Sequence, residues 1–313
     1  MYDLYTFGEI MALFLTQDRD SVVAASSFER LAAGAEANVA VAVSRLGLST
    51  YFYTRLGQDQ LGDAVLADLR REGVDVDDVR RTSDITGILI RNTGQSSALE
   101  TTYARRGSAA TGIESNDIDL DVLGNSRWLH VTGISAAISK SAREAVAYAL
   151  NHARALDMNI SLDLNIRRKL WSEAEAAVAL LPMAHDLDVL IGGVDEYQAV
   201  FGVSDPETCL QKAVDRGVAH AIMTNAELPV RVRSGAERFD VAPPRVTSID
   251  PVGAGDAFTG GVIAGLLAGL DIHAAVVQGS SCGSHVAAQR GDWAGLPTGT
   301  AGMASRNYIE ATT

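Results

Sequence analysis

A short stretch, DPVGAGD at residues 250–256, contains the residue types best suited to chemistry. Gly253, Ala254 and Gly255 come directly before an apolar run that predicts a helix over residues 254–270. Small residues leave the first backbone amides of a helix unobstructed, and those amides have no acceptor within the helix. Together with the helix dipole they form a site where an anion can bind.

Asp256 lies in or next to the first turn of this predicted helix. A carboxylate beside an anion site would normally repel a phosphate. The arrangement is useful if Asp256 instead takes the proton of an alcohol while the amides hold a phosphoryl group in transfer. The spacing alone does not decide between this interpretation and an ordinary turn with an aspartate cap.

The elements around this stretch predict an α/β fold. Strand-like runs cover residues 4–10, 50–55, 128–132, 160–164, 189–191 and 221–224, and helix-like runs cover 35–46, 61–72, 141–156, 173–181, 195–201, 207–217, 254–270 and 272–288. This alternation is typical of a mostly parallel central sheet with helices on both faces.

Two regions interrupt the alternation. Residues 84–106 predict two strands around a polar turn that contains glycine, and residues 12–33 look extended. We expect a small β-sheet lid formed from about 12–33 and 84–110, within a single domain that covers residues 1–313. An ordinary edge hairpin is the alternative for residues 84–106.

Composition narrows the classes of function. The formal net charge of −13 argues against nucleic acid as a partner, because phosphate backbones require a basic surface. Cys209 and Cys282 are the only cysteines and lie far apart, so neither a disulfide framework nor a zinc site is expected. The N-terminus has no basic segment of a signal peptide, and the longest apolar run is too short to span a membrane. We therefore expect a cytoplasmic protein.

Two motifs resemble those of the ribokinase-like (PfkB) sugar kinases. DPVGAGDAFTGG, from residue 250, is similar to the C-terminal signature of that family, and LAAGAEANVAVAVSRLG at 31–47 is similar to its N-terminal signature. The resemblance runs from Thr6 to Trp293. It implies a ribokinase-like fold with a β-sheet lid, and transfer of the γ-phosphoryl group of ATP to a sugar hydroxyl with Mg²⁺ present.

Several stretches are most similar to 2-keto-3-deoxygluconate kinases, among them TFGEIMALF at 6–14, YARRGSAA at 103–110 and RGDWAGLP at 290–297. This resemblance implies a sugar-acid substrate. Arg105 and Arg167 would bind the carboxylate, which a guanidinium matches with two hydrogen bonds. The other substrate-binding residues that it implies are Gly34, Asn38, Tyr103 and Ile134.

The resemblance also implies roles around the phosphates. Asp256 would deprotonate the acceptor hydroxyl, and the amides of residues 253–255 would bind the transferring group. Asp250 would shape the loop, with a possible monovalent cation such as K⁺ beside it. The implied nucleotide-side residues are Asn165, Glu196, Thr224, Asn225, Gly255 and Ser280, with Glu196 acting on the hydrated metal through water.

The sequence departs from the family pattern on the nucleotide side. Ala226 and Pro229 stand where the nucleotide loop usually has glycines, and Gly193 stands where an asparagine is usual. Glycine allows φ > 0 and close approach of the backbone to phosphates, whereas proline removes an amide donor. Two alternatives therefore stay open: a kinase for a neutral sugar such as fructose or ribose, and a catalytically weak sugar-acid-binding protein. Open strand edges in the lid also predict a homo-oligomer.

Overall fold

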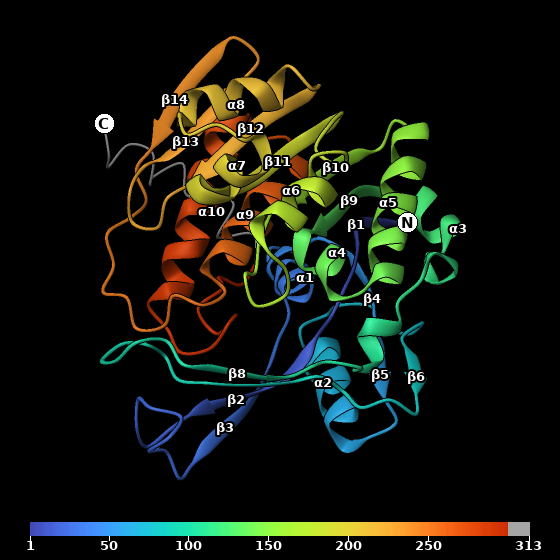
Figure 1. The fold of residues 1–313 in the computed structure, drawn as a ribbon, viewed down its shortest axis with the longest axis vertical. Helices are drawn as coiled ribbons and strands as arrows, with labels where there is room; N and C mark the ends of the chain where they lie inside the picture. Colours follow the sequence, from blue (N-terminus) through green and yellow to red (C-terminus); the bar gives the residue numbers. More distant parts are fainter. Residues whose placement is uncertain (300–313) are drawn as a thin grey trace.

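The computed structural model describes residues 1–299, and its centre is an eight-stranded sheet (Figure 1). The strand order is β14-β13-β12-β11-β10-β9-β1-β4. All neighbouring pairs from β12 to β4 are parallel, whereas β13 and β14 are antiparallel additions at one edge. The strands are β1 (Tyr2–Phe7), β4 (Thr50–Tyr53), β9 (Ser126–Thr132), β10 (Asn159–Asp163), β11 (Leu187–Gly193), β12 (Val218–Thr224), β13 (Val230–Ser234) and β14 (Glu237–Val241).

Helices cover both faces of this sheet, which confirms the predicted α/β class. Side chains of a strand alternate between the faces. In β1, Leu4 therefore packs with α1 (Ala35–Arg45), α2 (Gln60–Arg71), α9 (Ala254–Leu267) and α10 (Ile272–Ala287), and Tyr5 packs with the helices of the opposite face. The opposite helices are α3 (Leu120–Gly124), α4 (Gly133–Ile138), α5 (Lys140–Ala155), α6 (Glu173–Leu180), α7 (Val194–Phe201) and α8 (Pro206–Val214).

A separate four-stranded sheet lies beneath the α/β body in Figure 1, as the sequence predicts. Its order is β3-β2-β7-β8, built from β2 (Met11–Thr16), β3 (Phe28–Ala33), β7 (Ile88–Arg91) and β8 (Thr101–Ala104). Strand β2 pairs in parallel with β7 and antiparallel with β3. A short parallel pair, β5 (Arg55–Gly57) and β6 (Arg80–Thr82), and two 3₁₀ turns at Ala109–Gly112 and Ser115–Asp117 complete the described elements.

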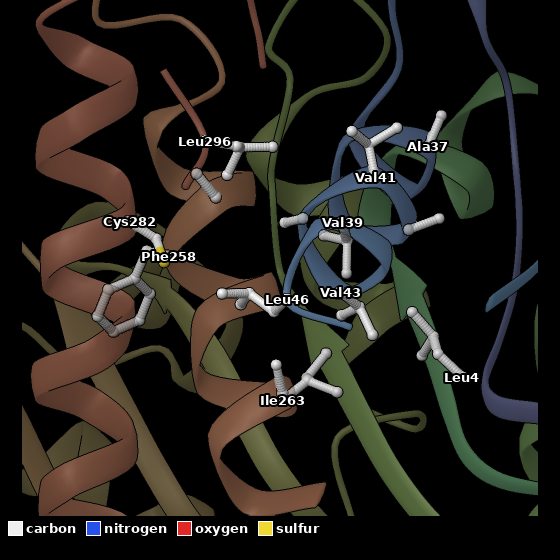
Figure 2. Packing of buried hydrophobic residues seen from close by; sticks show 14 of the residues in the cluster. Leu4, Ala37, Val39, Val41, Val43, Leu46, Phe258, Ile263, Cys282 and Leu296 are labelled. Carbon is white, nitrogen blue, oxygen red and sulfur yellow. The ribbon is translucent and has the colours of Figure 1, made fainter. Parts of the chain in front are cut away.

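Helices α1, α9 and α10 meet closely because glycines line their crossings. A Cβ on Gly260 would lie 2.5 Å from the Cβ of Ala42, and a Cβ on Gly279 would lie 2.7 Å from the carbonyl oxygen of Phe258. Figure 2 shows side chains of α1 and α9, Val39 and Ile263 among them, gathered in the same core. This packing fixes the N-terminus of α9, where the glycine–aspartate motif lies. Within the described residues, no helix is long and apolar enough to cross a membrane.

Candidate active site

The DPVGAGD stretch forms the turn into α9. Gly253 precedes the helix in the left-handed conformation, with φ of 86°, and a Cβ there would lie 2.4 Å from the carbonyl oxygen of Asp292. Within residues 1–299, the amides of Gly255 and Asp256 have no hydrogen-bond acceptor, and a Cβ on Gly255 would meet no atom within 4 Å. The amide of Ala254, which was also predicted to be open, instead donates to the carbonyl oxygen of Pro251 at 3.3 Å. The start of α9 is therefore an open set of amide donors, as an anion site requires.

Asp256 is buried three residues into this turn and faces a second carboxylate. Nδ2 of Asn38 donates to Oδ2 of Asp256 at 2.7 Å and to Oδ2 of Asp292 at 3.3 Å. Burial raises the pKa of Asp256 from 3.8 to about 7, although the Asn38 hydrogen bond and the charge of Arg167 lower it. A carboxylate with a pKa near neutrality is suited to accept a proton at physiological pH.

A second group of polar residues lies at the carboxyl ends of β10 and β11. Asp163 ends β10, accepts hydrogen bonds from Asn165, and has its pKa raised well above 3.8 by burial and by the charges of Glu196 and Asp256. The two oxygens of Glu196 accept from the amides of Ile166 at 2.6 Å and Gly193 at 2.7 Å. Asn165 and Glu196, which were predicted from separate motifs, are thus brought together.

A cavity of about 960 Å³ opens between the small sheet and the loop after β10. Its lining contains cationic side chains and no acidic one: Arg105, Arg106, Arg167, Arg168 and Lys169. Tyr103 of β8 also lines it, with guanidinium and ammonium groups of Arg105 and Lys169 near its ring face. A cavity of this composition is suited to a small organic anion.

The two predicted carboxylate-binding arginines differ in their surroundings. Arg105 forms an ion pair with the buried Glu9, whose other oxygen accepts from Ser108 at 2.9 Å. Arg167 has no carboxylate within ion-pair distance among residues 1–299 and is close enough to Asp256 to lower the pKa of that carboxyl. Arg167 therefore connects the cavity with the proposed base and has a free guanidinium.

The remaining predicted sugar residues lie on α1 and α4. Gly34 precedes α1 with φ of 178°, and a Cβ there would lie 2.3 Å from the carbonyl oxygen of Glu9, so the position requires glycine for space. Ile134 is near the start of α4, whereas the cavity is lined by Ala137 and Ile138 at the end of that helix. The structure does not bring Ile134 to the cavity lining.

The predicted nucleotide-side residues lie at the end of β12 and on α10. Thr224 ends β12 and donates to the carbonyl oxygen of Gly192 at 3.3 Å, and Asn225 lies in the exposed turn that follows. Ala226 in that turn has φ of 47°, so the position keeps a left-handed backbone although glycine is absent. The hydroxyl of Ser280 is buried and has no hydrogen-bond partner among residues 1–299.

Asp250 is held by an arginine that the sequence did not single out. Arg91, at the end of β7, donates to Asp250 at 2.8 Å and to Asp292 at 2.7 Å, and all three side chains are buried. Arg91 was missed because most arginines are exposed and no motif surrounds it. Asp292 lies inside the stretch RGDWAGLP that carries part of the resemblance, and Asp163 lies two residues before Asn165, so these positions were the available signal.

The two sheets and the glycine–aspartate helix start define a ribokinase-like fold. The chain belongs to the pfkB family of carbohydrate kinases, because the model of that family matches residues 1–299. Among curated proteins, it is 33% identical to a 2-dehydro-3-deoxygluconokinase of Bacillus subtilis, over 95% of this chain and 93% of that protein. It is 32% identical to another of Thermoproteus tenax, over 87% of this chain and 84% of that one.

Solved structures agree in fold. A 2-dehydro-3-deoxygluconokinase of Thermotoga maritima superposes with a TM-score of 0.87 at 27% identity, covering 100% of both chains. A PfkB protein of Polaromonas superposes with a TM-score of 0.84 at 31% identity, again over 100% of both chains. A putative ribokinase II of E. coli, solved with ATP and Mg²⁺, has a TM-score of 0.90 at 24% identity over 99% of this chain and 100% of its own.

Proposed function

We propose that this protein is an ATP-dependent kinase that phosphorylates the terminal hydroxyl of 2-keto-3-deoxygluconate. The observation that carries the proposal is the guanidinium of Arg167, which has no ion-pair partner among residues 1–299, lines a cation-rich cavity and is close enough to Asp256 to lower its pKa. A neutral sugar would leave that cation without a charged partner in the cavity, whereas a carboxylate can accept two hydrogen bonds from it. Relatives that act on 2-dehydro-3-deoxygluconate, the same compound, support the substrate class.

Asp256 serves as the general base in this proposal. Its carboxylate takes the proton of the terminal hydroxyl, and the hydroxyl oxygen then attacks the γ-phosphorus of ATP while the bond to the leaving ADP oxygen breaks. The open amides of Gly255 and Asp256 bind oxygens of the transferring group. Arg167 binds the sugar-acid carboxylate, and Tyr103 and Asn38 provide polar contacts to the hydroxyl groups.

Mg²⁺ fits the residues at the ends of β10 and β11. Asp163 is buried and Glu196 is half-buried, the negative charge of Glu196 raises the pKa of Asp163, and a hard divalent cation relieves such repulsion. The described residues contain no group of three metal-ligating side chains, which suits a metal that keeps most of its water. When bound, Mg²⁺ neutralises charge on the phosphates. Ser280, with its unpartnered hydroxyl, and Thr224 would face the nucleotide.

Three further expectations concern a monovalent cation, the oligomeric state and the cellular compartment. A monovalent cation near Asp250 would have to rely on carbonyl oxygens, because Arg91 and the amide of Gly291 already engage that carboxylate. A homo-oligomer through the open edges of the small sheet can be tested by analytical ultracentrifugation. Two free, buried cysteines suit a reducing compartment such as the cytoplasm.

The proposal is tested by a coupled ADP-release assay with 2-keto-3-deoxygluconate, its galacto epimer, fructose and ribose. We expect kcat/KM to be greatest for a sugar acid. A preference for fructose or ribose would favour the neutral-sugar alternative. Failure to bind ATP in the presence of the sugar acid would favour the binding-protein alternative.

Substitutions of the neighbouring residues Arg167 and Arg168 test carboxylate recognition directly. Arg167→Ala should raise KM for the sugar acid by roughly 100-fold and KM for ATP far less, because a charge-assisted pair is lost. Arg168→Ala is the matched control, since its exposed guanidinium already bonds Glu173 and Asp195. Equal effects of Arg167→Ala on both substrates would contradict carboxylate recognition by Arg167.

A further inference from the structure

A buried ion-pair network connects the small sheet with the phosphoryl-transfer site. Arg91 is the last residue of β7, and its side chain is fully buried. Its two terminal nitrogens bond different carboxylates, Asp250 at 2.8 Å and Asp292 at 2.7 Å. A buried guanidinium is tolerated only when it is paired and hydrogen-bonded in this way, so these three side chains hold one another in place.

The network continues to Asp256 through one amide group. Nδ2 of Asn38 donates both to Asp292 and to Asp256, and its Oδ1 accepts from the amide of Gly34 at 3.4 Å. The position of Asp292 therefore influences where the Asn38 amide points. That amide is the only side-chain hydrogen-bond donor to Asp256 among residues 1–299.

We propose that Arg91 is a positioning residue for phosphoryl transfer. It fixes Asp292, which shares the Asn38 amide with Asp256, and so holds the base in the direction of the acceptor hydroxyl. It also places a positive charge between Asp250 and Asp292, two of the three carboxylates that lie close together here. The inference rests on the proposed function for the role of Asp256 and adds to it a residue from the small sheet.

A second arginine, Arg290, also links the C-terminal loop to the small sheet and allows a comparison with Arg91. Nη of Arg290 donates to the carbonyl oxygen of Thr16 in β2, so it also joins the C-terminal loop to the small sheet. Arg290 is exposed and bonds none of the three carboxylates. Loss of Arg290 removes a link between the same two segments without changing the charge around Asp256, which makes it the matched control.

The kinetic test compares Arg91→Met with Arg290→Met. We expect Arg91→Met to lower kcat by roughly 100-fold, because a misdirected base reacts poorly, while KM for both substrates changes less than about threefold. Arg290→Met should keep kcat within about threefold of the wild type. Similar losses of kcat in both variants, or a loss confined to KM, would overturn the proposal.

The second readout is the titration of the aspartate carboxyls by ¹³C NMR, which needs no turnover. The charged groups that face Asp256 are Arg167, Asp163, Glu36 and Asp292. Without Arg91, we expect one of the two carboxyls bridged by Asn38 to keep its proton to higher pH than in the wild type, because a neighbouring cation is gone. An unchanged titration would overturn the proposal.

The test remains decisive if Arg91→Met fails to fold or if the wild type is inactive. If Arg91→Met does not fold, Arg91→Lys keeps the charge but can bond only one carboxylate well, and it should show a smaller loss of kcat and a smaller titration shift in the same directions. Wild-type values for Arg91→Lys would then count against Arg91. If the wild type phosphorylates none of the sugars, the proposed function fails, whereas the titration still decides whether Arg91 acts on the carboxylates.

Discussion

Asp256 is buried although its proposed role requires a negative charge. Its folded-state pKa of about 7 lies above the ordinary value of 3.8, with burial as the largest cause. The folded protein therefore binds this proton more tightly than the unfolded chain does. Stability contributed by the neutral carboxyl is lost as the pH rises from about 4 to 7, and above pH 7 the ionised group destabilises the fold.

Asp256→Asn tests this opposition between stability and activity. We expect turnover to fall by about 10³-fold, because the amide cannot accept the proton. We also expect the variant to be more stable than the wild type at pH 8, by up to a few kcal/mol, and this difference to shrink at pH 5. Thermal melting at both pH values measures it. A variant that is less stable at pH 8 would contradict the raised pKa.

Ala226 is strained in the nucleotide-side turn, since its φ is 47°. Ala226→Gly should stabilise the protein by about 0.5–1 kcal/mol, because relief of left-handed strain exceeds the extra chain entropy of glycine. Ala236→Gly, in the exposed β13–β14 turn, is the control, since Ala236 has no positive φ and should be neutral or slightly destabilised. Urea unfolding of the three proteins provides the measurement.

At the scale of elements, α9 and α10 use glycine for two different purposes. Gly279 allows the helices to touch, because a Cβ there would lie 2.7 Å from both the carbonyl oxygen of Phe258 and a methyl of Val262. Gly255 keeps the helix start open, because a Cβ there meets no described atom within 4 Å. The first glycine therefore serves packing and the second serves access to the amides.

These two glycines predict opposite results for the same substitution. Gly279→Ala should destabilise the protein by about 1–3 kcal/mol, because close packing cannot absorb the methyl group. Gly255→Ala should be neutral or stabilising by up to about 1 kcal/mol, since alanine favours helix, yet should weaken ATP binding. Chemical denaturation and nucleotide titration distinguish them. Unimpaired ATP binding by Gly255→Ala would contradict the anion site.

The sequence predicted the elements with strong periodicity and missed those without it. The parallel strands were recognised as continuous apolar runs, and α9 was placed correctly at its start. Its end was overestimated, because Gly269 adopts φ of 84° and the helix stops at Leu267. Strands β13 and β14 were missed, because VRVRS and ERFDV are rich in charge and lie at a half-exposed edge.

At the scale of the whole molecule, a protein of net charge −13 contains a cavity lined by arginine and lysine. Within the Debye length, which is about 10 Å at 0.1 M salt, the local cations dominate the field that a small anion experiences. We therefore expect KM for the sugar acid to rise about threefold between low and 0.3 M salt. A neutral sugar, if accepted, serves as the control. A fall in KM would show that the overall negative charge dominates.

The candidate site was predictable where residues lie in local motifs. Asp256 and the glycines of the α9 turn were singled out from a local motif and Asn38 from the family resemblance, and the structure brings Asn38 to Asp256 across 218 positions of the chain. Pairings that depend on tertiary structure could not be predicted. Arg105 bonds Glu9, and Arg91 reaches Asp250, because the small sheet folds back beneath the body.

The cavity is lined by residues from separate segments of the chain. Tyr103 and Arg105 belong to β8 and the residues just after it, whereas Arg167 belongs to the loop after β10, and the phosphoryl-transfer motif lies on α9. In the proposed function, the residues that bind the acceptor therefore come from other segments of the chain than the motif that binds the transferring phosphoryl group. Replacing only residues 99–107 with those of a relative, which leaves Arg91 in place, should change the part of carbohydrate selectivity that depends on Tyr103 and Arg105, while ATP binding is retained.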